Sequence, residues 1–298
     1  MTEAITTHGL GKTYGGRAVV SDLDLRVPWG CVYGFLGPNG SGKSTTMKML
    51  LSLVRPTTGE IRVLDRPMDR RTRRSVLREV GSLIESPPGY GHLTGGENLR
   101  IVQRLLDLDD AQVDRAVRTV RMQDQLGKLV RHYSLGMKQR LGIAMALARE
   151  PRLLVLDEPT NGLDPAGIEE IRALLGELAG RGITVLVSSH LLGEIDRVAS
   201  VLGVLAGGRL IFQGGRDELL ARSRPDVLID TSDPPRAAAL LGQVPLDGAS
   251  VRLPGVDDRG TAGAVEHLVR SGLGVHGVRR QERSLEDVFL ALTDGGGL

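Results

Sequence analysis

The chain has 298 residues with 38 basic and 36 acidic side chains, giving a formal net charge of +2. Its length allows one or two domains with a large core, and its charge balance argues against strong overall attraction to nucleic acid or membrane surfaces. Cys31, the only cysteine, excludes an intrachain disulfide and is compatible with a reducing compartment, and we expect neither a secretory signal nor a membrane-spanning segment.

Short apolar runs between residues 23 and 205 predict β-strands, and helix-like segments separate most of them. The runs Leu153–Leu156 and Val185–Val187 lack polar alternation, which is typical of strands buried on both faces. This order of elements predicts an α/β fold with a doubly wound sheet. The predicted strands are Leu23–Val27, Cys31–Leu36, Glu60–Leu64, Val80–Ile84, Leu153–Leu156, Thr184–Ser188 and Val201–Leu205.

Residues 87–149 have a helical pattern and predict an insertion into the α/β domain. Thr94 and Glu97 have the spacing of a capping box before a first helix. Leu108–Val120 has the period of a second helix, and a third is expected to begin near Gly136.

The last part of the chain predicts a small α+β domain over residues 221–298, after a first domain at 1–220. Prolines and scattered glycines favour loose connections between its elements. The predicted elements are strands at Asp226–Thr231, Ser250–Leu253 and Val275–Arg279, and helices at Arg236–Leu241, Ala262–Ser271 and from Ser284 through Ala291. We expect this domain to support dimerisation or regulation rather than catalysis.

The stretch "GPNGSGKST", residues 37–45, matches the pattern of a phosphate-binding loop. It joins the predicted strand Cys31–Leu36 to a predicted helix over Thr45–Leu51, which is the context that the motif requires. Glycines let backbone N–H groups turn toward phosphate oxygens, and the helix N-terminus favours an anion. Lys43 is expected to reach the β- and γ-phosphates of a nucleotide, and the Ser44 hydroxyl to bind Mg²⁺. The alternative is a glycine-rich turn that binds nothing.

Two carboxylates end the predicted strand in "LLVLDEP". Asp157 is expected to hold Mg²⁺, directly or through water, and Glu158 to polarise the water that attacks the γ-phosphate. The alternative is an ordinary polar turn at the end of a strand.

With the stretch "YSLGMKQR", residues 133–140, the chain resembles the nucleotide-binding subunits of ATP-binding-cassette (ABC) transporters over roughly residues 3–220. The resemblance rests on the phosphate loop, this signature motif and "VLDEPTNGLD", in that order. It implies an ABC ATPase fold of the P-loop NTPase class, with ATP and Mg²⁺ as cofactors and ATP hydrolysis as the activity.

The resemblance also implies roles for single residues. Tyr14 resembles the aromatic residue that stacks on adenine, and His190 in "VSSHLL" the switch histidine that binds the γ-phosphate. Ser134 and Gly136 open a helix that in the family contacts ATP on the opposite subunit, which implies a head-to-tail homodimer. Residues 161–164 resemble the loop that crosses the dimer interface. The nucleotide-binding residues implied are Tyr14, Asn39, Gly40, Ser41, Gly42, Lys43, Ser44, Thr45, Ser134 and Gly136.

Glu85 in "VGSLIESPPGY" departs from the common family pattern, which has glutamine at this position. In the family this residue contacts Mg²⁺ and the attacking water, so Glu85 is implied as a metal and catalytic residue with Glu158 and His190. A carboxylate there could bind Mg²⁺ more directly or change the protonation of a neighbouring acid. Together with Leu135 and Met137 in the signature motif, it resembles the bacitracin-resistance and lantibiotic-immunity subgroup of exporters. "SLEDVFLALT", residues 284–293, resembles the tail of drug-export members.

We therefore expect the motor of an exporter for an antibiotic, peptide or drug-like compound, paired with a separate integral-membrane permease at the inner face of the cell membrane. An importer motor, and a soluble ATPase acting on ribosomes or DNA, are the alternatives. The soluble relatives usually carry two cassettes or long coiled-coil insertions, which this chain lacks, so no nucleic-acid partner is expected. A P-loop kinase leaves the signature motif unexplained.

One cluster of like charge stands out from the balanced composition. It fits a solvated helix face or a phosphate-contacting patch, and the first is the more common. Its members are Arg70, Arg71, Arg73, Arg74 and Arg78.

Overall fold

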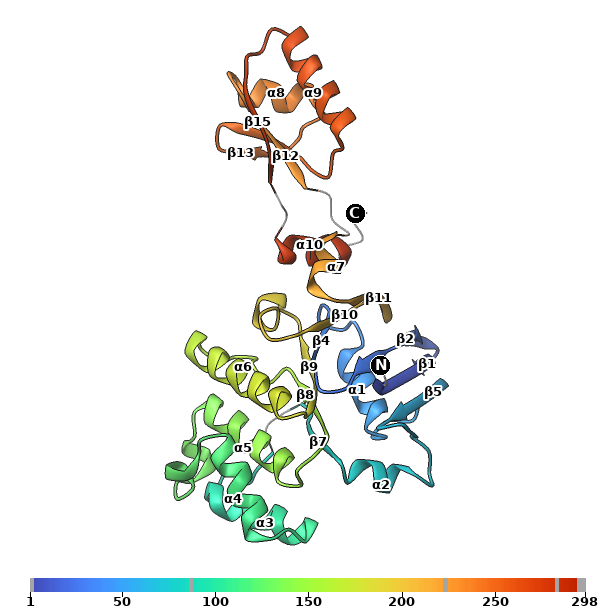
Figure 1. The fold of residues 1–298 in the computed structure, drawn as a ribbon, viewed down its shortest axis with the longest axis vertical. Helices are drawn as coiled ribbons and strands as arrows, with labels where there is room; N and C mark the ends of the chain where they lie inside the picture. The colour runs from blue at the N-terminus through green and yellow to red at the C-terminus, as the bar shows by residue number, and fades with distance from the viewer. Residues whose placement is uncertain (1–2, 86–87, 222–224, 282–283, 294–298) are drawn as a thin grey trace. The chain divides into compact units, whose positions relative to one another are not determined.

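The computed structural model describes residues 3–85, 88–221, 225–281 and 284–293. The chain divides into two compact units, Met1–Gly215 and Arg216–Leu298 (Figure 1). Helix α7 (Arg216–Ala221) belongs to the second unit, where it packs against α10 (Leu285–Thr293). The division therefore falls five residues before the boundary expected from the sequence.

A six-stranded sheet forms the centre of the first unit, in the order β11-β10-β4-β9-β8-β7. The five strands from β10 to β7 are parallel, and β11 pairs antiparallel with β10 at the edge. Three of the strands, β4, β8 and β9, are buried along their whole length, as their unbroken apolar runs predicted. The bounds are β4 (Val32–Leu36), β7 (Val80–Leu83), β8 (Leu153–Asp157), β9 (Thr184–Ser189), β10 (Val201–Ala206) and β11 (Arg209–Gly214).

A second, antiparallel sheet precedes the parallel one and was missed in part by the sequence analysis. Its order is β2-β1-β5-β6, and β3 also pairs with β1. The strand predicted at Leu23–Val27 is wrong, because the ladder is interrupted at its centre. There the Thr7 hydroxyl donates a hydrogen bond to Leu23 O at 2.6 Å and accepts one from Leu25 N at 2.8 Å. The bounds are β1 (Glu3–Tyr14), β2 (Arg17–Leu23), β3 (Arg26–Pro28), β5 (Thr58–Val63) and β6 (Arg66–Pro67).

Helices cover the parallel sheet on both sides. In Figure 1, α1 (Lys43–Leu50) lies to the right of the central strands and α6 (Pro165–Gly180) to the left. Met47 and Met49 of α1 are buried in the core with Tyr33 and Phe35 of β4. The short α2 (Arg73–Leu77) packs against β7. This arrangement confirms the predicted α/β fold with a parallel sheet.

Three helices form the insertion between β7 and β8. They are α3 (Gly95–Leu106), α4 (Asp110–Thr119) and α5 (Leu135–Leu147), with 3₁₀ turns η1 (Gln123–Gln125) and η2 (Val130–His132) between α4 and α5. The capping box of Thr94 and Glu97 is confirmed at the start of α3, and Asp109 and Gln112 form another at the start of α4. Helix α5 packs against both α4 and β7, which fixes the insertion to the edge of the sheet.

The second unit contains an antiparallel sheet in the order β13-β14-β12-β15. Helices α8 and α9 pack on one face of it, over a small core that contains Val227, Ile229, Val251 and Leu268. The two-residue β13 was not predicted. The bounds are β12 (Asp226–Thr231), α8 (Pro234–Leu240), β13 (Leu246–Asp247), β14 (Ser250–Leu253), α9 (Asp258–Arg270) and β15 (Val275–Gln281).

No helix in the described ranges combines the length and the apolar character needed to cross a membrane.

Candidate functional site

The phosphate loop connects the carboxyl end of β4 to the first turn of α1, at the edge where parallel sheets bind ligands. Gly37 has no room for a side chain, because a Cβ atom there would lie 2.2 Å from the carbonyl oxygen of Leu205. Gly42 has φ +108° and caps α1, a conformation that costs other residues free energy. The backbone between these glycines is therefore held in one shape, with its N–H groups near a helix N-terminus.

Lys43 lies almost completely buried inside this loop, with 5% of its side chain exposed. Its ammonium group donates hydrogen bonds to Gly37 O at 2.7 Å and Pro38 O at 3.2 Å, and lies 3.6 Å from Glu158 Oε1. Burial lowers the pKa of Lys43 below its usual value, and the carboxylates of Glu158 and Asp157 act in the opposite direction. The loop thus places one cation beside a helix N-terminus.

The loop fits a phosphate group. The Ser41 hydroxyl is buried and has no hydrogen-bond partner among the described residues. It is therefore available to donate a hydrogen bond to a bound anion. The Ser44 and Thr45 side chains are half-buried at the start of α1. Asn39 and Gly40 are exposed at the tip of the loop.

Asp157 and Glu158 lie at the carboxyl end of β8, next to the loop. The Ser188 hydroxyl donates to Asp157 Oδ1 at 2.6 Å and accepts from the Glu158 backbone N–H at 2.9 Å. Glu158 has φ +48°, an uncommon conformation for a residue with a side chain and one that is frequent at functional sites. Ser188 was missed by the sequence analysis, although a hydroxyl at the end of a buried strand next to Ser189 and His190 was a usable signal.

Glu158 stands between the phosphate loop and His190. Its Oε1 atom faces Lys43, and its Oε2 atom lies 3.3 Å from His190 Nδ1 and accepts a hydrogen bond from Asn161 Nδ2 at 3.2 Å. The contact with Nδ1 lacks the alignment of a hydrogen bond, since that nitrogen has no partner among the described residues. The fold therefore brings Lys43, Glu158 and His190 together from three separate segments of the chain.

Glu85 follows β7 in a turn with φ +67°, and its carboxylate forms an ion pair with Lys48 of α1. The pair is largely exposed on the carboxylate side, where 66% of the Glu85 side chain is accessible. The hydrogen bond from Lys48 to Glu85 raises the pKa of Lys48. The structure thus gives Glu85 a cationic partner, and its role at a metal stays a prediction.

Tyr14 ends β1 with 47% of its surface exposed. The Lys12 ammonium lies over this ring, 4.7 Å from its centre, and so covers part of it. The remaining exposed surface of the ring is free to stack on a planar group.

The signature motif opens α5 at a different place. The Ser134 hydroxyl caps the helix by accepting a hydrogen bond from Met137 N at 3.2 Å. Ser134 and Gly136 line an open pocket with Gly162, Leu163 and Asp164, from the loop before α6. None of residues 37–45 lines this pocket in the described chain, so one copy of the protein does not join its signature motif to its phosphate loop.

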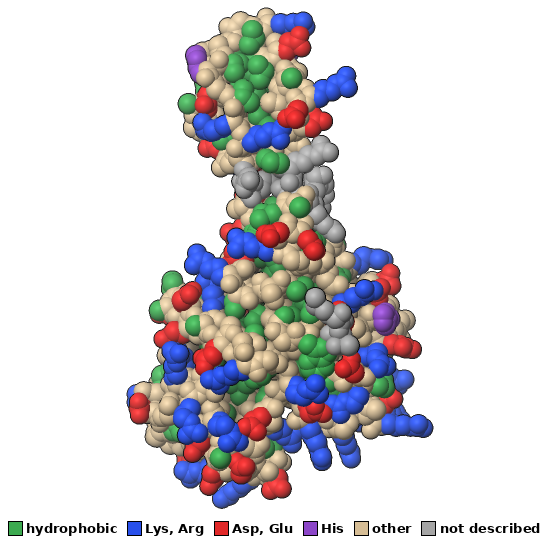
Figure 2. Space-filling model, viewed as in Figure 1, with side chains coloured by type: hydrophobic (Ala, Val, Ile, Leu, Met, Phe, Trp, Pro, Cys, Tyr) green, Lys and Arg blue, Asp and Glu red, His purple; other side chains and the backbone are tan. Residues whose placement is uncertain are grey.

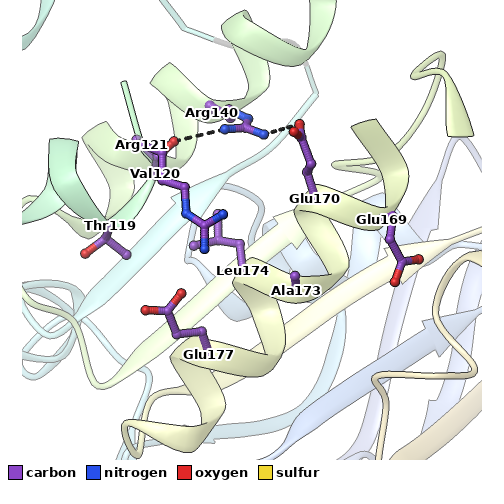
Figure 3. A pocket seen from close by; sticks show the side chains of 9 residues that line it. All are labelled: Thr119, Val120, Arg121, Arg140, Glu169, Glu170, Ala173, Leu174 and Glu177. Carbon is purple, nitrogen blue, oxygen red and sulfur yellow. Dashed lines mark hydrogen bonds and ion pairs between the residues drawn. The ribbon is translucent and has the colours of Figure 1, made fainter. Parts of the chain in front are cut away.

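Arg140 connects the signature helix to α6. Its guanidinium donates a hydrogen bond to Val120 O at 3.3 Å and forms an ion pair with Glu170. Figure 3 shows this pair at the upper edge of a neighbouring pocket, above the apolar side chains of Ala173 and Leu174. Arg140 therefore ties the signature helix of the insertion to α6.

Comparison with known proteins supplies the family. The model of the ABC transporter family matches residues 20–161. The bacitracin transport ATP-binding protein BcrA of Enterococcus faecalis is 40% identical over 307 residues, covering 100% of this chain and 99% of that protein. The chain belongs to the ABC transporter family, as an ATP-binding subunit.

The names of other relatives of this ABC subunit refer to a drug or to a peptide antibiotic. The daunorubicin resistance ATP-binding protein DrrA3 of Streptomyces coeruleorubidus is 38% identical over 305 residues, covering 97% of this chain and 96% of that protein. The lantibiotic transport ATP-binding protein SrtF of Streptococcus pyogenes is 41% identical over 204 residues, covering 68% and 87%. A solved ATP-binding subunit of an ABC transporter covers 73% of this chain and 92% of its own, with 29% identity and a TM-score of 0.66.

These comparisons confirm the predicted family, the ABC ATPase fold and the activity: this ABC subunit binds ATP and couples its hydrolysis to transport. ABC ATP-binding subunits generally work with a membrane permease. The roles of the individual site residues stay predictions.

Proposed function

We propose that this ABC subunit powers the export of an antibiotic, peptide or other drug-like compound through a separate integral-membrane permease. The supporting observation is the match to BcrA over 99% of that protein's length, which includes the residues of the second compact unit. The subunit then acts from the cytoplasm, at the inner face of the cell membrane. The transported compound is bound by the permease, so its identity lies outside this chain.

Within the subunit, we assign the phosphate contacts to the loop from Asn39 to Thr45 and to Lys43. The buried ammonium cannot exchange its partners for water, so a phosphate oxygen competes only with Gly37 O, Pro38 O and Glu158. Tyr14 stacks on the adenine ring.

The Ser44 hydroxyl and the Asp157 carboxylate would hold Mg²⁺, with Glu85 as a further candidate ligand. When bound, Mg²⁺ supplies positive charge to the phosphate oxygens. Ser188 fixes the Asp157 carboxylate by donating to Oδ1, which leaves Oδ2 directed away from that hydrogen bond. The donor set of one hydroxyl and carboxylates fits a hard, oxygen-binding cation.

Glu158 accepts the proton of the attacking water, and His190 binds the γ-phosphate. The Glu158 carboxylate is held by Lys43 on one oxygen and by Asn161 on the other, so it is oriented before the substrate arrives. His190 lies next to it, at the end of the adjacent parallel strand.

The catalytic unit is a head-to-tail homodimer in this proposal. The open pocket around Ser134 and Gly136 offers a helix N-terminus and a hydroxyl, and none of residues 37–45 is among the described residues that line it. A second copy supplies the missing ATP, and the loop before α6 lies at the same pocket.

The Glu158→Gln variant tests this proposal. It keeps the shape of the side chain but cannot accept a proton, so turnover should fall by about 10² to 10⁴ while ATP binding persists. ATP should then hold the variant as a dimer, measured by sedimentation, whereas adding Ser134→Glu should abolish dimer formation without abolishing ATP binding. Hydrolysis at the parent rate would contradict the role of Glu158.

The partner is tested by trapping tagged Glu158→Gln with ATP in membranes of the host and identifying the proteins that co-purify. A polytopic protein without its own ATPase domain supports the exporter. Ribosomal proteins or nucleic acid would contradict the membrane role while leaving the ATPase assignment intact.

A further inference from the structure

A single carboxylate oxygen joins the turns that carry Glu158 and His190. Glu194 ends the 3₁₀ turn η3 (Leu192–Glu194), and its Oε2 atom accepts hydrogen bonds from Thr160 Oγ1 at 2.7 Å and Ser189 Oγ at 2.8 Å. Thr160 lies two residues after Glu158, and Ser189 lies directly before His190. Both hydroxyl groups belong to buried residues, so water does not replace this acceptor without cost.

The backbone of Glu194 is fixed from another direction. Arg172 of α6 donates a hydrogen bond from Nε to Glu194 O at 2.6 Å and one from Nη2 to Gly193 O. The same guanidinium pairs with Glu169 on its own helix at 3.0 Å. Helix α6 therefore holds the main chain of Glu194 while the side chain reaches the two turns.

The connection to His190 runs through Ser189. The Ser189 hydroxyl accepts a hydrogen bond from Leu191 N at 3.0 Å, which closes a tight turn around His190. The proton of that hydroxyl has two acceptors in reach, Glu194 Oε2 at 2.8 Å and Leu191 O at 3.0 Å, and the carboxylate is the nearer and the charged one. The carboxylate and the turn therefore share this hydroxyl.

We propose that Glu194 is a positioning residue for ATP hydrolysis: it holds the Glu158 turn and the His190 turn in register across the ends of β8 and β9. The inference rests on the proposed roles of Glu158 and His190. It concerns only the arrangement of these two groups, since within the described part of the chain the Glu194 carboxylate bonds to Thr160 and Ser189 and not to Lys43 or its loop. Loss of Glu194 should therefore affect the chemical step more than ATP binding.

The test compares Glu194→Ala with Glu194→Gln in steady-state hydrolysis. The Ala variant should lose at least about tenfold in kcat with KM for ATP within about threefold of the parent, because a misplaced catalytic group is costly while binding is retained. The Gln variant keeps an oxygen acceptor for both hydroxyls and should recover most of the rate. Glu169→Ala is the matched control, because it removes an exposed carboxylate that pairs with Arg172 and is not hydrogen-bonded to Thr160 or Ser189 in the described part of the chain.

Equal kcat in the Ala variant and the parent, or a rise in KM with kcat unchanged, would overturn the role of Glu194. Should the Ala variant not fold, Ser189→Ala and Thr160→Val each remove one of the two hydrogen bonds, and kcat should fall in both. If neither lowers kcat, the proposal is overturned. A dead Glu158→Gln beside a fully active Glu194→Ala would reject this inference alone.

A second, independent observation concerns charge. Residues 60–80 hold seven arginines and four carboxylates, whereas the remaining residues hold 31 basic and 32 acidic side chains. The whole positive excess of the chain therefore lies in this segment. Six of the arginines are exposed and form no ion pair with a described residue, and one of these, Arg62, donates a hydrogen bond to Asp65 O. We call the other five the arginine surface: Arg70, Arg71, Arg73, Arg74 and Arg78.

The carboxylates near this surface are already engaged. Glu79 pairs with Arg66 and, at 3.3 Å, with Arg152. Asp69 accepts hydrogen bonds from the backbone N–H groups of Arg71 at 2.7 Å and Thr72 at 3.0 Å, and these bonds lower its pKa. Lys and Arg side chains gather over the region of α2, at the lower right of Figure 2. Arg71 is attracted to Asp69, but no member of the surface forms an ion pair with a carboxylate of the described residues.

We infer that the arginine surface binds the anionic headgroups of phospholipids when the subunit works at the membrane. The inference rests on the proposed membrane role. Nucleic acid is the poorer match, because residues 60–80 contain no aromatic side chain to stack on bases and α2, with five residues, is too short to read a groove. Guanidinium groups form paired hydrogen bonds with phosphate oxygens.

Vesicle sedimentation tests this with the full chain and two lipid mixtures, phosphatidylcholine alone and phosphatidylcholine with 30% phosphatidylglycerol, a composition that is about one third anionic. Binding should require the anionic lipid and weaken with salt. Replacing Arg70, Arg71, Arg73 and Arg74 by Gln should reduce it, by up to about fivefold per arginine. The matched control replaces four exposed arginines of the insertion: Arg100, Arg104, Arg118 and Arg131.

Equal binding by the two quadruple variants, no binding by the parent, or preference for a DNA or RNA oligonucleotide over the vesicles would overturn the lipid assignment. If a permease co-purifies with trapped Glu158→Gln from membranes of the host while the lipid assignment fails, the exporter proposal stands without lipid binding by the arginine surface.

Discussion

The phosphate-loop half and the signature half of the proposed site differ in how far one chain completes them. Lys43 is buried and has three oxygen partners from its own chain, and Glu158 is held from both sides. Ser134, by contrast, is exposed, and its neighbour Leu135 has 42% of its surface accessible at an open pocket. The first half is preorganised by internal contacts. In the second half the Ser134 hydroxyl accepts a hydrogen bond from Met137 N but donates to no described residue, which supports the proposal that another copy completes it.

The largest expected effect comes from adding one methyl group to the phosphate-loop half of the site. Gly37→Ala places a Cβ atom 2.2 Å from Leu205 O, so the loop must move and lose its shape. We expect ATP affinity to fall at least about a hundredfold, with a loss of about 1–3 kcal/mol in the free energy of unfolding from overpacking. Nucleotide titration and thermal unfolding measure the two effects.

Gly207→Ala is the control for Gly37→Ala. Gly207 also has a positive φ, +54°, but a Cβ atom there would meet nothing within 4 Å. It should cost about 1–2 kcal/mol of backbone strain and leave ATP affinity unchanged. If both variants lost ATP affinity equally, loop crowding at Gly37 would not be the cause.

A smaller effect is expected in the other half. Arg140→Ala removes the ion pair with Glu170 and the hydrogen bond to Val120 O, and so releases the signature helix from α6. We expect turnover to fall about tenfold, because a misplaced helix start costs transition-state contacts, while ATP binding by the single chain stays within about twofold. Arg104→Ala removes an exposed arginine of the same insertion and should change neither quantity. A loss of ATP binding with Arg140→Ala would show that the halves are not separate within one chain.

The parts of the fold that were predicted correctly have local causes. Strands β4, β8 and β9 are continuous apolar runs because both of their faces are covered. The capping box before α3 is formed by residues within one stretch of four. The phosphate loop was equally visible, because its glycines and lysine are contiguous. These features depend on neighbours in the sequence.

The missed parts depend on contacts between distant segments. Strand β1 mixes glycine, threonine and lysine and has register shifts against both β2 and β5, so it lacks a regular period. Strand β11 had a usable signal, since Gly207 and Gly208 form the turn of a hairpin with β10. Ser188 and Glu194 gain their partners only because β8 and β9 are adjacent and η3 folds back on them.

The smallest effect is expected at Glu85, at the border of the preorganised half. Its carboxylate pairs with Lys48, and it is mostly exposed, so the pair contributes little to stability, about 0–1 kcal/mol at most. Glu85→Gln should therefore leave the free energy of unfolding nearly unchanged and alter turnover by less than about threefold. ATPase assays across a Mg²⁺ titration measure whether the carboxylate also binds the metal, in which case more Mg²⁺ would be needed for half-maximal rate.

The pH dependence separates the ion pair from metal binding. Glu85 raises the pKa of Lys48, so the contribution of the pair to stability is complete below the unfolded pKa of about 10.5 and is lost as the pH rises through the folded value. Glu85→Gln should accordingly remove the small contribution of the pair at neutral pH and flatten the loss of stability in the alkaline range, where the variant and the parent converge. Thermal unfolding between pH 7 and 11 would measure both. An effect at neutral pH that depends on Mg²⁺ would instead assign Glu85 to the metal. The phosphate-loop half of the site would then include this residue from the turn after β7.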